Sequence, residues 1–147
     1  MTSAMNLEPP SPSKARLIGE FLRLSGIQRQ IDEAGFFDRF CGPGGAVFEV
    51  LPPDTLYGQA SETARNAVRT AYEPHRCTWQ REYNDHMNWE FEESELEEIV
   101  SFLGSPAGQH YREGTLRMNA YIATNTEDLV EQVVREACIL ASDKRAT

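Results

Sequence analysis

Apolar residues recur three and four positions apart along most of this chain, and short stretches rich in Gly, Pro and Ser separate the runs. That spacing places the apolar side chains of each run on one face of an α-helix. No internal repeat, sustained heptad pattern or convincing set of strands interrupts it. The sequence therefore predicts an all-α fold, an irregular bundle of about six to seven helices whose short connections favour antiparallel neighbours.

Residues 1–11 are rich in Pro and Ser without periodicity, and they are expected to form a flexible tail before a single helical domain over 12–147. Ser11 is expected to cap a first helix that begins at Pro12 and ends at Gly26. Further helices are expected at about 27–40, 55–72, 77–91, 93–103 and 106–122, and from 127 onward, with a buried turn or short helix at 46–51. The last helix carries a long apolar stripe of Leu129, Val130, Val133, Val134, Ala137, Cys138 and Ala141.

Composition and net charge argue against some classes of binding partner. The 147 residues suit one domain, and 14 basic against 23 acidic residues give a net charge of −9, which repels phosphate backbones and anionic lipids. No apolar run approaches the roughly 20 residues that a membrane span needs. The first residues lack the plan of a signal peptide, so the sequence as given predicts a cytoplasmic protein that binds no nucleic acid.

The stretch FLGSPAGQHY, at 102–111, predicts a compact corner between two helices. Gly104 is expected to take a positive φ and end one helix, Ser105 to cap the next, and Pro106 to fill its first turn. Ala107 and Gly108 are small enough for the second helix to begin close to the first. Gly108 weakens a helix by up to about 1 kcal/mol relative to Ala, so we expect close approach of another backbone to compensate.

Residues 91–111, FEESELEEIVSFLGSPAGQHY, resemble the signature of the DUF2059 family, a group of bacterial proteins of unknown function, and residues 14–32 resemble its opening helix pair. The family has Ser or Thr where Glu92 stands, so the cap of that helix is expected to come from elsewhere, and Leu103 replaces the second aromatic residue of the pattern. The resemblance implies an all-helical domain, periplasmic or exported if a leader was removed, and brings no catalytic residues. The matching residues are Phe91, Glu95, Leu96, Ile99, Phe102, Ser105, Pro106, Ala107, Gly108 and Gln109.

Cys41, Cys77 and Cys138 are an odd number without CxxC spacing, which argues against a zinc site or a disulfide framework. Burial as small apolar residues is the favoured interpretation, and one disulfide between Cys41 and Cys77 is the alternative. Cys138 lies on an apolar stripe and is expected in the core.

Candidate chemistry is sparse. The six glutamates of 90–98 favour a solvated helix face over a cation site or an acidic patch that binds a partner, and no calcium-loop pattern accompanies them. His75, Cys77, Asp85 and His86 are close in sequence but match no established ligand spacing. His110 follows the corner and would be unremarkable on an exposed helix face. No P-loop, GxSxG, HExxH or DxDxDG motif occurs, so no catalytic residue, metal or cofactor is predicted.

These observations favour a non-enzymatic domain that binds a protein partner or associates with itself. A second hypothesis is a small-ligand pocket between helices near Trp79, Tyr83 and Trp89, although such aromatic side chains more often fill a core. A third and less favoured one is a metal-dependent or hydrolytic enzyme that uses His75, His86 and neighbouring acids.

Overall fold

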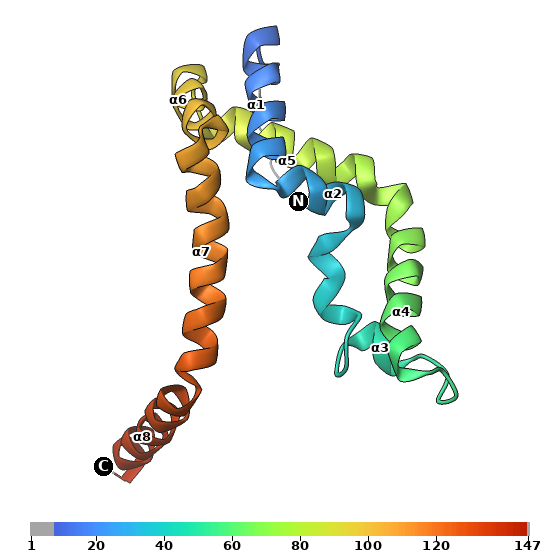
Figure 1. The fold of residues 1–147 in the computed structure, drawn as a ribbon, viewed down its shortest axis with the longest axis vertical. Helices are drawn as coiled ribbons and strands as arrows, with labels where there is room; N and C mark the ends of the chain where they lie inside the picture. The colour runs from blue at the N-terminus through green and yellow to red at the C-terminus, as the bar shows by residue number, and fades with distance from the viewer. Residues whose placement is uncertain (1–7, 147) are drawn as a thin grey trace. The chain divides into compact units, whose positions relative to one another are not determined.

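The structure is a computed structural model that describes residues 8–146, without the side chains of residues 57 and 144–146. Within that range the chain forms eight α-helices and two 3₁₀ helices (η) and no strand (Figure 1). The all-α prediction is confirmed, with a helix number close to the expected one. The helices are α1 Pro12–Ser25, α2 Ile27–Glu33, η1 Gly35–Phe40, α3 Ala46–Glu49, α4 Tyr57–Tyr72, η2 Glu73–His75, α5 Arg76–Glu90, α6 Glu93–Gly104, α7 Pro106–Asn125 and α8 Glu127–Ala146.

The chain divides into two compact units, Met1–Ser105 and Pro106–Thr147, where the sequence predicted one domain from residue 12 onward. Residues 1–7 of the predicted tail lie outside the described residues. We call the two parts unit 1 and unit 2 and describe each by itself.

The beginning and end of α1 follow the sequence prediction. The hydroxyl of Ser11 accepts a hydrogen bond from the backbone N–H of Lys14 at 3.1 Å, and Pro12 occupies the first turn. Gly26 ends the helix in the left-handed region with a φ of 84°, which an L-residue with a side chain adopts only under strain.

The expected helix over 27–40 is wrong in one respect, because it breaks at Ala34. This residue takes a φ of 58° and donates its backbone N–H to the carbonyl of Gln30. The chain then tightens into η1, which carries Phe36 and Phe37. Their rings lie 5.8 Å from Tyr83 and 5.7 Å from Trp79 respectively, so the break brings two aromatic side chains onto α5.

The main core of unit 1 forms where α1 packs against α6 and α5 (Figure 1). Leu22 and Leu96 are 0% exposed, and Ile18 and Met87 complete the buried cluster. Phe91 packs against it from the start of α6, with its ring 6.3 Å from that of Phe21. The short helix expected at 46–51 is present as α3, but it buries no described side chain, so the expected burial there is wrong.

The start of α6 corrects the expectation that its cap comes from elsewhere. Glu92 is itself the N-cap, and its carboxylate accepts the backbone N–H of Glu95. The Glu95 carboxylate in turn accepts the backbone N–H of Glu92 at 3.0 Å. Glu92 thus fills the role of Ser or Thr in a capping box, because a carboxylate accepts the same hydrogen bond.

The corner at 104–106 is built differently from the prediction. Gly104 is the last residue of α6 and has no positive φ, so that part of the prediction is wrong. The turn comes from Ser105, whose backbone is extended and whose hydroxyl donates to the carbonyl of Phe102 at 2.6 Å. Helix α7 begins at Pro106 as expected, and Gly108 is buried.

Substitution of two glycines by alanine should have opposite effects on stability, one at the end of α6 and one before α3. A Cβ on Gly104 would meet only Leu24 Cδ1, at 3.8 Å, so Gly104→Ala should raise the free energy of unfolding by up to about 1 kcal/mol. A Cβ on Gly45 would lie 2.6 Å from the Phe40 carbonyl, so Gly45→Ala should lower it by about 1–3 kcal/mol. Urea unfolding followed by circular dichroism measures both, and a destabilising Gly104→Ala would contradict a helical Gly104.

Candidate functional site

The aromatic residues proposed for a pocket do not gather in one place. Trp79 and Tyr83 lie on α5 within a packed cluster of rings that includes Phe36, Phe37 and Tyr72, with centroid distances of 5.5–5.9 Å between several of the pairs. Trp89 is 53% exposed and lies beside His86 instead. The structure therefore brings two of the three together, and there they contact other rings.

Tyr72 is the unusual member of this cluster. Its ring is buried, and its hydroxyl has no hydrogen-bond partner within the described part of the chain. Burial raises the pKa of the Tyr72 phenol above its ordinary value, since ionisation would place a charge among rings. Arg76 opposes this rise, and Asp32 and Glu73 add to it.

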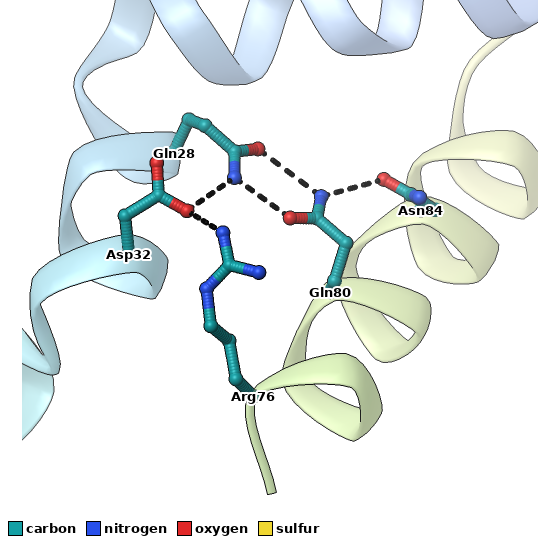
Figure 2. Close-up of polar contacts among 5 residues, drawn as sticks. All are labelled: Gln28, Asp32, Arg76, Gln80 and Asn84. Carbon is teal, nitrogen blue, oxygen red and sulfur yellow. Dashed lines mark hydrogen bonds and ion pairs between the residues drawn. The ribbon is translucent and has the colours of Figure 1, made fainter. Parts of the chain in front are cut away.

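A polar network joins α2 to α5 near this cluster (Figure 2). The amides of Gln28 and Gln80 bond reciprocally, at 2.7 and 3.1 Å, and Gln80 also donates to Asn84 at 3.3 Å. Asp32 accepts from Gln28 and pairs with Arg76, and this contact raises the pKa of the Arg76 guanidinium. The network fixes α2 to α5, because the side-chain donors of one helix bond to acceptors on the other.

A groove of about 440 Å³ lies beside the network, lined by Gly19 of α1 and by Gln28, Gln80, Asn84 and Asp85. Its amides can hydrogen-bond a small polar molecule, and Asp85 supplies its one carboxylate. The facing amides of Gln28 and Gln80 already bond to each other, so a ligand would have to compete with those bonds.

The candidate metal and acid–base residues are scattered. His75 ends η2, whereas His86 lies on α5 and faces Glu90 at 3.8 Å. The glutamates between 90 and 98 are exposed or half-buried. Within the described residues, no three His, Cys, Asp or Glu side chains come together in a way that could hold a metal ion.

All three cysteines are free, and only Cys41 is buried. Its thiol donates to the Phe37 carbonyl at 3.4 Å, and burial raises its pKa, with a smaller contribution from Asp38. Cys77 and Cys138 are exposed, so the expectation of burial is wrong for both, and Cys138 is not in a core.

The strongest feature of unit 2 is an exposed apolar stripe along α8. Cys138 of this stripe was expected in the core, but every residue of the stripe is exposed, for example Val133 at 63%. Ile139, also exposed at 58%, lies on the other side of the helix, outside the stripe. We call the following residues the α8 stripe: Leu129, Val130, Val133, Val134, Ala137, Cys138, Leu140 and Ala141.

Helix α7 carries a second apolar line. Tyr111, Met118 and Ile122 are spaced by seven and four residues, so they share one face, with Thr115 between them. All three apolar side chains are more than half exposed, and we call them the α7 face.

Unit 2 buries almost nothing of its own. Among its described residues only Gly108 is buried, although α7 and α8 are 20 residues long each. Helices in proteins gain most of their stability from packing an apolar face, and isolated ones are marginal in water. The α8 stripe and the α7 face are therefore surfaces that gain stability once something covers them.

Periodicity predicted which side of α8 is apolar, but it did not predict that this side is exposed. A stripe tells which side of a helix is apolar, but it does not tell whether the cover comes from the same chain. Of the helices in the described residues, none combines the length and the apolar content that crossing a membrane requires.

Comparison of the chain with protein families, with curated proteins and with solved structures found no match.

Tyr72 gives a test of the aromatic cluster. Since its pKa is raised in the folded state, the unfolded phenol ionises first, near 10.0, and stability should be lost as pH rises beyond that value. Tyr72→Phe should weaken this alkaline loss and raise the free energy of unfolding at pH 7 by up to about 1 kcal/mol, because no buried hydroxyl remains unsatisfied. Urea unfolding at pH 7 to 11 measures both effects. Destabilisation at pH 7 would indicate that the hydroxyl has a bonding partner.

Thiol labelling tests the placement of the cysteines. In the native protein at pH 8, Cys77 should react with a thiol reagent within minutes, and Cys41 only after unfolding. Mass spectrometry of the labelled peptides identifies each site. A Cys41–Cys77 disulfide would instead leave Cys138 as the only thiol that labels, even in denaturant without reductant.

Proposed function

We propose that the protein acts by binding another protein chain through the α8 stripe and the α7 face, and not by catalysis. The observation that carries this proposal is the exposure of two apolar helix faces in a unit that has almost no buried residues. Apolar helix faces that line up at positions three and four apart are the usual contact of helix-in-groove and helix-bundle recognition.

Charge favours a protein partner over a lipid surface. Helices that lie on membranes carry Lys and Arg on their polar face. Helix α8 instead carries Glu127, Asp128, Glu131, Glu136 and Asp143 against three basic residues, in a chain of net charge −9. Anionic lipid headgroups would repel this surface.

Unit 1 suits the role of a stable support. Its helices bury Leu22 and Leu96 fully, and the α2–α5 polar network adds a second set of contacts. The small-ligand alternative has less support, because the side chains of Trp79 and Tyr83 pack against the rings of Phe37 and Phe36.

We also propose that the chain is a relative of the DUF2059 family, on the strength of residues 91–111. The structural roles of these residues support this: Leu96 is buried in the core, Phe91 packs against it, and α7 begins directly after Ser105. Periplasmic or exported location, as the resemblance implies, is part of the same proposal.

A pair of α8 variants tests the proposed function. Tagged full-length protein is used to capture binding chains, itself included, from a lysate of its source. Val133→Asp places a charge in the α8 stripe and should reduce capture at least tenfold. Ile139→Asp changes a β-branched residue of similar exposure outside the stripe, so it should capture as the wild type does. Equal capture by both variants, or no association in any case, would contradict the proposal.

A further inference from the structure

The α8 stripe is arranged so that it complements itself. It begins at Leu129 and ends at Ala141, so its midpoint is residue 135. A two-fold axis at that point, with two copies of α8 antiparallel, places residue i against residue 270 − i of the second copy. Leu129 then meets Ala141, Val130 meets Leu140, and Val133 meets Ala137. Two of these three pairs match a large side chain with a small one, which lets the two helices interdigitate. The other two stripe residues, Val134 and Cys138, come level with Glu136 and Gln132.

Charge along α8 favours the same orientation. Residues 127–136 hold four acidic residues and one basic, whereas residues 137–146 hold one acidic and two basic. In this register Glu127 comes level with Asp143, but the two basic residues at 144 and 145 follow directly, so the acidic end of each helix meets an end of the other that is basic on balance. A parallel pair would place Glu127 and Asp128 against their own copies, and it would also align the two helix dipoles unfavourably.

We infer that the α8 stripe is covered by α8 of a second copy of this chain, packed antiparallel about a two-fold axis near residue 135. This inference rests on the proposed function and names its partner. A contact between identical patches must be its own complement under a two-fold rotation. Six of the eight stripe residues pair with one another in this way, and the acidic half of α8 faces the half that holds two basic residues. The α7 face lies outside this contact and remains open to another chain.

Solution mass gives the first test. Under reducing conditions the full-length protein should sediment as a dimer of twice 16.6 kDa and dissociate on dilution. Val133→Asp should weaken the dimer at least tenfold, and Ile139→Asp should leave it unchanged. Circular dichroism and urea unfolding of each variant show that unit 1 remains folded, so that loss of the dimer is not loss of the fold.

Disulfide trapping tests the orientation. In a Cys77→Ser, Cys138→Ser background, Leu129→Cys and Ala141→Cys proteins should each stay unlinked alone, because equivalent residues lie at opposite ends of the antiparallel pair. Mixed and oxidised, they should form a disulfide-linked heterodimer. Links within each single variant would mean a parallel pair and would overturn the inference.

The experiments distinguish failure of the homodimer from failure of the proposed function. A monomer at every concentration, with no trapped disulfide, overturns the homodimer. If Val133→Asp still loses, and Ile139→Asp still keeps, a different protein in the capture experiment, the proposed function stands with another partner. If neither experiment distinguishes Val133→Asp from Ile139→Asp, both proposals fail.

Discussion

Helices α1 and α6 come from opposite ends of unit 1, and at their contact Leu22 and Leu96 lose all exposure to water. Full burial of a leucine side chain contributes about 1.5–3 kcal/mol, a sizeable part of the net stability of a small domain. The contact also closes the longest loop of the unit, since it joins residues more than 70 positions apart. The remaining helices are held against this pair by Met87, by the rings around Trp79 and by the α2–α5 amide network.

In unit 2, by contrast, burial of side chains does not offset the entropy cost of ordering the chain. Ordering a residue costs about 1–2 kcal/mol of backbone entropy, and in α7 and α8 almost no buried side chain of their own offsets that cost. Side-chain pairs such as Glu113–Arg117 supply only a few tenths of a kcal/mol each. A second chain that covers the α8 stripe would supply the missing burial, so folding and association of this unit are one balance of free energy.

Some features of the two units could be predicted from the sequence, and others could not. Local chemistry was predictable where one residue decides it, as in the Ser11 cap and the left-handed Gly26. Ala34 escaped prediction because alanine does not favour a positive φ, so nothing in its own chemistry marks the break that precedes Phe36 and Phe37. Glu92 escaped because Ser, Thr, Asp and Asn are the usual N-caps and the longer glutamate side chain seldom takes that place. The α8 stripe was found, but periodicity alone could not show that its residues are exposed.

Net charge sets a condition on any self-association. Two copies of a chain with charge −9 repel each other, so a dimer must place its like charges apart or match them. The antiparallel arrangement does so on α8, since the acidic half of each helix faces the half that holds two basic residues. Salt acts on this contact in two opposed ways, because screening weakens both the general repulsion and the attraction at the helix ends. The apolar stripe carries the affinity, and the distribution of charge selects the orientation in which that stripe can be used.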